Sequence, residues 1–258
     1  MIEAAGRFEF KYVVPVSARD ELLKLVRQYV QEDPHAGDLG GGRRGYQVRS
    51  IYYDGDQFPL YGTRLDSEKV RTVLRVRSYA DGGDDQPVFL EAKRKLQERV
   101  VKHRVKVGRL GEYEGPSMEL LKRHPGRAGR RFVGLIEKWQ AKPRVLVHYE
   151  REIFLPRGFD DQQTRLTLDT NIRAVAVDDH RAFRGSGELV IPDGWIVMEQ
   201  KFNRVMPEWM RRLSAHLELV SESVSKFALG VSQTHRLHRP HEVELFMPYT
   251  LKRLRRVS

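Results

Sequence analysis

The strongest constraint on this chain is a set of short segments in which charged residues alternate with apolar ones. The first segment, RFEFKYVVP, places Arg7, Glu9 and Lys11 at every second position, with aromatic residues between them. Successive side chains of a β-strand point to opposite faces, so this spacing predicts a strand with one charged and one aromatic face. A single strand of this kind could simply be a solvated edge.

The same alternation recurs in at least six later segments. The residues on their charged faces are Arg75 and Arg77; Glu91, Lys93 and Lys95; Lys102, Arg104 and Lys106; Tyr149 and Arg151; Arg165, Thr167 and Asp169; and Glu199 and Lys201. A repeated pattern favours a sheet closed on itself, because the apolar faces then pack under helices while the charged faces line a water-filled tunnel. We therefore expect an α+β fold built on an antiparallel β-barrel with flanking helices.

Cations outnumber acids on the predicted tunnel face. The candidate cations are Lys11, Arg75, Arg77, Lys93, Lys102, Arg104, Arg151, Arg165, Lys201 and Lys226, and the candidate acids are Glu9, Glu91, Asp169 and Glu199. Arginine binds phosphate oxygens in a bidentate fork and lysine supplies a point charge. Carboxylates among them imply a bridging hard cation, Mg²⁺ or Mn²⁺. The combination suits a linear polyphosphate bound with metal ions.

The remaining pattern predicts helices and loops around one sheet. Helices are expected over residues 17–33, with a capping box at Ser17, over about 117–140, over 207–219 and over 224–237. The Gly-rich stretch 36–45 is interpreted as a flexible loop, and residues 54–62 as a turn or short loop. The composition shifts little along the chain, so residues 1–258 are interpreted as a single domain, with a core at about 7–240 and a basic tail.

Composition narrows the function further. Lys and Arg total 46 against 35 Asp and Glu, a net charge of +11, which favours polyanionic partners. The absence of cysteine excludes disulfides, thiolate metal sites and a cysteine nucleophile. We find no signal-peptide pattern and no apolar run of the ~20 residues that a membrane span needs. A cytoplasmic location is therefore expected.

The ordered motifs resemble a known family. RFEFKY, SIYYD, LRVRSY, FLEAKRK, HYERE, TRLTLD, MEQKF and SVSKF, from about Arg7 to Phe227, are similar to the VTC (vacuolar transporter chaperone) domain. That domain is the polyphosphate polymerase branch of the triphosphate tunnel metalloenzymes, also called CYTH-like. The resemblance implies a tunnel fold with a helix at the tunnel, and transfer of the ATP γ-phosphate onto inorganic polyphosphate with Mn²⁺ or Mg²⁺.

The resemblance also implies roles for individual residues. Catalytic roles fall on Lys93, Arg75, Arg77, Arg151 and Arg165. Phosphate-binding roles fall on Lys11, Lys102, Arg104, Tyr149, Lys201, Ser225 and Lys226. Glu199 would hold the metal. The strand pattern adds Glu9 and Glu91 as further candidate metal ligands, and a cross-strand ion pair with Arg7 is the alternative role of Glu9. Tyr52 is interpreted as structural, Asp169 as either a metal ligand or the cap of a turn, and Lys95 and Lys106 as solvated.

Alternative functions stay open at this point. The hydrolase branch of the superfamily begins with Glu-x-Glu-x-Lys, whereas this chain has Arg7 at the first position, which disfavours a triphosphatase. A non-catalytic polyanion sensor is a further alternative. Nucleic acid is a less suitable partner, because the aromatic residues alternate to the face opposite the cations. Coupling of synthesis to transport would need a separate membrane protein partner, which would place the domain at the inner face of a membrane.

Overall fold

The computed structural model describes residues 8–65, 70–79, 83–96, 99–117, 119–120, 126–158 and 164–237. Arg7 and the basic tail, for which we made predictions, lie outside these residues. The described strands form one eleven-stranded sheet in which every pairing is antiparallel. The mainly antiparallel α+β architecture predicted from the sequence is confirmed.

The main path of the sheet runs in the order β1-β11-β9-β8-β4-β5-β6-β7. These strands are β1 (Phe8–Pro15), β11 (Trp195–Phe202), β9 (Arg165–Ala176), β8 (Lys142–Pro156), β4 (Arg43–Asp54), β5 (Val70–Ser78), β6 (Pro87–Leu96) and β7 (Arg99–Arg109). Three short strands pair at its margins: β2 (Val30–Glu32) with β8, β3 (Gly37–Gly40) with β4, and β10 (Glu188–Leu189) with β9.

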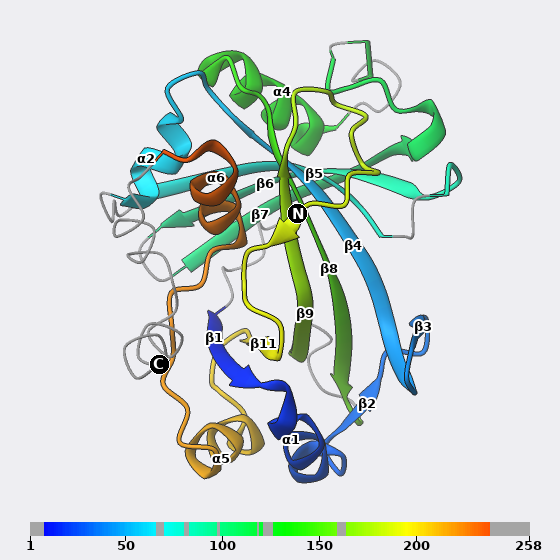
Figure 1. Ribbon diagram of the computed structural model, residues 1–258, viewed down its shortest axis with the longest axis vertical. Coiled ribbons are helices and arrows are strands. Elements are labelled where there is room, and N and C mark those ends of the chain that lie inside the picture. Colours follow the sequence, from blue (N-terminus) through cyan, green and yellow to red (C-terminus); the bar gives the residue numbers. More distant parts are fainter. Residues whose placement is uncertain are drawn as a thin grey trace.

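The sheet is strongly curled, and its inner face surrounds a helix. Figure 1 shows β5, β6 and β7 crossing the upper part of the molecule while β4, β8 and β9 run down it. Within the described residues the backbone ladder ends at β1 and β7, so the sheet is an open, curled form of the expected barrel. The tunnel character thus comes from curvature and side chains rather than from a closed ring of hydrogen bonds.

Helices cover both ends of the outer face. The described helices are α1 (Arg19–Val26), α2 (Pro59–Leu65), α4 (Arg127–Trp139), α5 (Glu208–His216) and α6 (Lys226–His235), and of these α1, α4 and α5 cover the outer face. Phe132 of α4 packs with Leu74 and Leu90 on one part of the outer face. Leu22 of α1 and Leu213 of α5 pack on the part formed by β1, β11 and β9. The apolar members of the alternating strands are therefore buried on this side, as the pattern predicts.

The helix α6 lies against the inner face, on β8 and β9. A Cβ atom at Gly230 would lie only 3.0 Å from a methyl group of Val147, so the absence of a side chain lets the helix approach the sheet. Ser225 caps this helix, because its hydroxyl accepts a hydrogen bond from the amide of Ala228 at 3.3 Å. The helix predicted over residues 224–237 is confirmed in position.

Several local predictions are wrong. The first helix ends at Val26 rather than residue 33, and residues 30–32 form β2, because their backbone pairs with the end of the long strand β8. Ser17 lies in a 3₁₀ turn, and α1 has no side-chain cap. Tertiary pairing overrides the helical spacing here.

The two predicted loops are also ordered. Part of the Gly-rich stretch 36–45 is β3, in a hairpin with β4, with three consecutive glycines at positive φ in its turn. Residues 59–65 form α2, whose first amides donate to the buried carboxylate of Asp54 at 2.9 Å. Of the helical region predicted over about 117–140, α4 covers 127–139.

Candidate functional site

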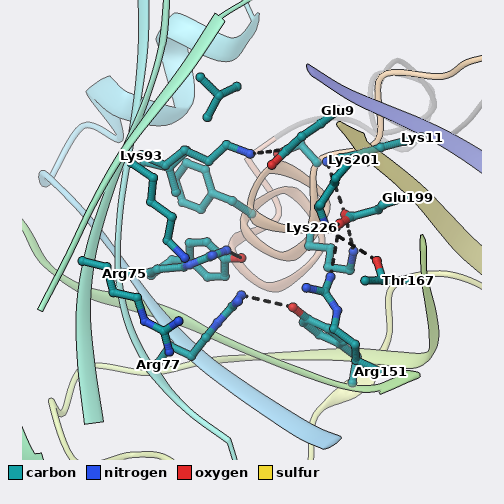
Figure 2. A pocket seen from close by; sticks show the side chains of 18 of the residues that line it. Glu9, Lys11, Arg75, Arg77, Lys93, Arg151, Thr167, Glu199, Lys201 and Lys226 are labelled. Carbon is teal, nitrogen blue, oxygen red and sulfur yellow. Dashed lines mark hydrogen bonds and ion pairs between the residues drawn. The ribbon is translucent and has the colours of Figure 1, made fainter. Parts of the chain in front are cut away.

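A cavity of about 370 Å³ lies between the inner face of the curled sheet and the first turn of α6. Figure 2 shows its charged side chains pointing toward one another from strands far apart in the sequence. The predicted site residues that line it are Glu9, Lys11, Arg75, Arg77, Lys93, Lys102, Arg104, Tyr149, Arg151, Arg165, Glu199, Lys201, Ser225 and Lys226. Strand alternation therefore directs the predicted set into one space.

The carboxylate of Glu91 is fully buried beside the cavity rather than lining it. Its oxygens lie 2.6 Å from a guanidinium nitrogen of Arg75, 2.6 Å from Nζ of Lys102 and 3.3 Å from Nε of Arg104. Burial opposes ionisation, but the nearby cations outweigh it and hold the pKa of Glu91 well below its usual value. Glu91 is thus the common counter-ion of three cations in the wall.

A second cluster surrounds Glu199 at the start of α6. Its carboxylate contacts Lys201, Arg151 at 3.3 Å, Lys226 at 3.3 Å and Lys11 at 3.8 Å. Despite its burial, these cations keep the pKa of Glu199 well below its usual value. The same carboxylate therefore links β1, β8, β11 and α6.

Asp169 belongs to this cluster. Two of its oxygens accept from Arg151, each at 2.6 Å, and Nζ of Lys226 lies 2.6 Å away. Asp169 is fully buried, so it does not cap an exposed turn. Asp169 follows Arg165 and Thr167 at every second position of β9, and this alternate spacing was the sequence signal that it faces inward. A register shift near Asn171, which has a φ of 50°, then turns Ile172 to the same inner face.

Tyrosine hydroxyls hold two of the arginines. Arg75 donates to the hydroxyl of Tyr52 at 3.3 Å, and Arg77 donates to the hydroxyl of Tyr149 at 3.1 Å. Tyr52 lines the cavity, although we interpreted it as structural from the sequence. Thr167 lines the cavity, as its place on the charged face of β9 predicts. Tyr79 lines it as well, although the sequence analysis did not single it out.

The cavity has a large excess of positive charge. Ten lysine and arginine side chains line it, against two carboxylates, those of Glu9 and Glu199. Burial lowers the pKa of Lys11 to about 8 and that of Lys102 to about 7, even though neighbouring carboxylates oppose the shift. Burial and the other cations thus outweigh the shared carboxylates, and the cavity keeps an excess of positive charge that suits an anionic ligand.

The donor set gives limited support to a metal ion. Within the described ranges, no three His, Asp or Glu side chains gather as a metal site. Glu9 and Glu199 both reach the cavity, and each is already paired with cations. Mg²⁺ commonly takes one or two carboxylates together with substrate phosphates and water, and these two residues fit that mode.

Comparison with known proteins identifies the family of the chain. The sequence profile of the VTC domain family matches residues 6–235. The chain belongs to the VTC domain family. Two curated relatives of this VTC domain are subunits 4 of vacuolar transporter chaperone complexes. The Schizosaccharomyces pombe protein is 25% identical over 233 residues, and the Trypanosoma cruzi protein is 27% identical over 230.

The alignments cover 74% of the present chain but only 32% and 28% of those two relatives. The chain therefore spans about a third of the length of these curated relatives. Among solved structures, a putative adenylyl cyclase from Hippeastrum, described as having a dominant triphosphatase activity, aligns with a TM-score of 0.51 at 14% identity. It covers 92% of this VTC domain and 99% of the Hippeastrum chain, which supports a shared fold. None of the helices in the described segments has the length and apolar character needed to span a bilayer.

Proposed function

We propose that this VTC domain is a polyphosphate polymerase, which transfers the γ-phosphate of ATP onto a growing inorganic polyphosphate chain and releases ADP. The observation that carries the proposal is the cavity lined by ten cations, inside a fold whose relatives are vacuolar transporter chaperone subunits. Phosphoryl transfer needs mainly alignment and neutralisation of charge, and such a cavity offers both.

The side chains divide the work by their chemistry. Arg75 and Arg77 present guanidinium groups that tyrosine hydroxyls hold in place, which suits bidentate binding of phosphate oxygens. Lys93 reaches the cavity with its ammonium group, and Arg151 and Arg165 complete the proposed catalytic set. Binding and alignment fall to Lys11, Lys102, Lys201 and Lys226, with Ser225 at the helix cap.

A divalent cation, Mn²⁺ or Mg²⁺, would neutralise charge on the phosphate oxygens when bound. Glu199 and Glu9 are the residues that would hold it together with the substrate, because both carboxylates reach the cavity. Glu91 is a less suitable ligand, since its oxygens are taken up by Arg75, Lys102 and Arg104. We assign it instead to the positioning of those cations.

The proposal extends to location and partners. ATP and polyphosphate are the expected ligands, and nucleic acid is not. A cytoplasmic domain that works with a separate membrane protein at the inner face of a membrane remains our prediction. Co-purification from detergent-solubilised membranes, with and without added polyphosphate, tests for that partner.

The decisive test of function is product analysis. The purified protein is incubated with ATP, a short polyphosphate primer and either Mn²⁺ or Mg²⁺, and products are resolved by gel electrophoresis and ³¹P NMR. Lys93→Ala is compared with Lys24→Ala, a lysine exposed on α1 outside the cavity. We expect longer chains with equal ADP release in the wild type and in Lys24→Ala, and neither in Lys93→Ala. Free phosphate without chain growth would assign a hydrolase instead, and binding of polyphosphate without turnover would assign a sensor.

A further inference from the structure

Aromatic rings lie beside one part of the cavity, and Tyr79 among them lines it. Phe89 on β6 faces Tyr79, which directly follows β5, with ring centroids 5.8 Å apart, and Tyr79 faces Tyr46 of β4 at 6.2 Å. Both contacts are edge-to-face. In the sheet register Phe89 lies opposite Arg77, two positions from the Arg75–Glu91 pair. Phe89 therefore continues the row of inward-facing side chains that contains Arg75, Arg77 and Glu91.

Arg104 lies on this aromatic group. The guanidinium carbon is 3.7 Å from the centroid of Phe89 and 5.2 Å from that of Tyr79, and the former is the shortest cation–ring distance in the described part of the chain. Nε of Arg104 also lies 3.3 Å from the carboxylate of Glu91. The ring and the carboxylate together fix the plane of the guanidinium group.

Arg104 is the most exposed of the cations paired with Glu91. Its side chain is 37% exposed, against 16% for Arg75 and 26% for Lys102. A guanidinium held on one face by a phenyl ring offers its second face for stacking, and arginine planes stack on nucleobases. Every base has a π-face, so such a surface needs no base-specific hydrogen bond.

We propose that Arg104, held on Phe89 beside Tyr79, is the platform on which the base of a nucleoside triphosphate stacks, while its phosphates extend toward Lys102, Arg75 and Arg77. This inference rests on the proposed function, because it assigns the donor nucleotide to one end of the same cavity. Lys102 is two residues from Arg104 on the same face of β7, a separation of roughly 7 Å in a strand. The proposal also revises the predicted role of Arg104 from phosphate binding to recognition of the nucleoside.

Two ligands separate a base contact from a phosphate contact. Inorganic tripolyphosphate carries the phosphates without the nucleoside, so ATP and tripolyphosphate are titrated calorimetrically under the same Mg²⁺ concentration. Arg104→Lys keeps the charge and loses the plane, and Arg109→Lys, an exposed arginine on the same strand, is the matched control. We expect Arg104→Lys to lower the affinity for ATP about tenfold and the affinity for tripolyphosphate less than about twofold. Arg109→Lys should bind both ligands as the wild type does.

A second variant tests the support of the platform. Phe89→Leu removes the ring beneath Arg104, and Phe10→Leu removes an outer-face ring that stacks on Phe202. We expect Phe89→Leu to lower the affinity for ATP more than that for tripolyphosphate. Phe10→Leu should leave the ratio of these two affinities unchanged. If Phe89→Leu does not fold, Arg104→Lys still decides the question.

The outcomes are distinguishable from those of the proposed function. Equal losses for ATP and tripolyphosphate in Arg104→Lys would make Arg104 a phosphate ligand and overturn the platform, as would no loss for either. A wild type that binds tripolyphosphate but not ATP would overturn it too. The titration does not depend on turnover. If Arg104→Lys selectively loses affinity for ATP and the wild type makes no polyphosphate, the stacking platform is kept and the polymerase is rejected.

Discussion

Nζ of Lys93 lies 2.6 Å from a carboxylate oxygen of Glu9, and this ion pair joins β6 to β1 across the seam between the two ends of the sheet. Both residues line the cavity, so the seam is closed by side chains that a substrate can compete for. A phosphate group bound by Lys93 would take the place of Glu9. Release from Lys93 would let the Glu9 carboxylate bind a divalent cation.

Glu9→Gln tests this exchange. Without metal, we expect tripolyphosphate to bind several-fold more tightly, because the amide no longer competes for Lys93. With Mn²⁺, we expect polymerase turnover to fall by about tenfold or more, because one of the two proposed metal carboxylates is lost. Titration in EDTA and turnover with Mn²⁺ measure the two effects. Weaker binding in EDTA would show that Glu9 supports Lys93 instead of competing for it.

Glu91→Gln tests the buried counter-ion. Removing its charge leaves Arg75, Lys102 and Arg104 without their shared anion, so we expect the free energy of unfolding to fall by ~3–5 kcal/mol. Glu208→Gln, which breaks exposed pairs with Arg211 and Arg212, should leave the free energy of unfolding close to the wild-type value. Urea unfolding measures both. Tripolyphosphate should stabilise Glu91→Gln more than the wild type, because the ligand supplies the missing negative charge.

Asp169→Asn distinguishes a buried ion pair from a turn cap. Asparagine caps turns and helices about as well as aspartate, so a capping role predicts little change. Arg151 and Lys226 both pair with the negative charge of Asp169. We therefore expect Asp169→Asn to lower the free energy of unfolding by about 3 kcal/mol, measured by urea unfolding. Asp179→Asn, at an exposed aspartate, is the control. Hydrogen exchange should also rise in α6, which Lys226 anchors, and unchanged exchange there would contradict the anchoring role.

The lowered lysine pKa values predict proton uptake on binding. The pKa of Lys102, about 7, lies below its value of 10.5 in the unfolded chain, so this lysine is largely neutral at about pH 8 in the free protein. A bound polyanion favours its charged form, so binding should take up protons at that pH and fewer at about pH 6. Calorimetry in two buffers of different ionisation enthalpy measures the uptake. Lys102→Arg, which stays charged, should take up fewer protons than the wild type, and equal uptake would reject Lys102 as the source.

The same shift has a consequence for stability. The unfolded chain binds more protons than the native protein between about pH 7 and 10.5, so the contribution of Lys102 to stability grows as the pH rises through that window. It is lost as the pH falls toward 7. Thermal unfolding of ligand-free wild type and Lys102→Arg across this range should therefore show a smaller pH dependence in the variant.

The sequence determined which residues face the cavity. Alternation along β5, β6 and β11 has a period of two, so once Arg75, Lys93 and Glu199 face inward, Arg77, Glu91 and Lys201 must do so as well. The apolar residues between them fixed the outer face and hence the helices that cover it. These features are local, and a local pattern is sufficient to predict them.

Only the tertiary structure decided which charges meet. Lys93 pairs with Glu9, which is 84 positions away in the chain, and Asp169 is shared by Arg151 and Lys226 from β8 and α6. The pairing of residues 30–32 with β8 and the contact of Arg104 with Phe89 likewise come from strand pairing. Strand order and curvature follow from long-range pairing, and the spacing of residues within one strand carries no record of it.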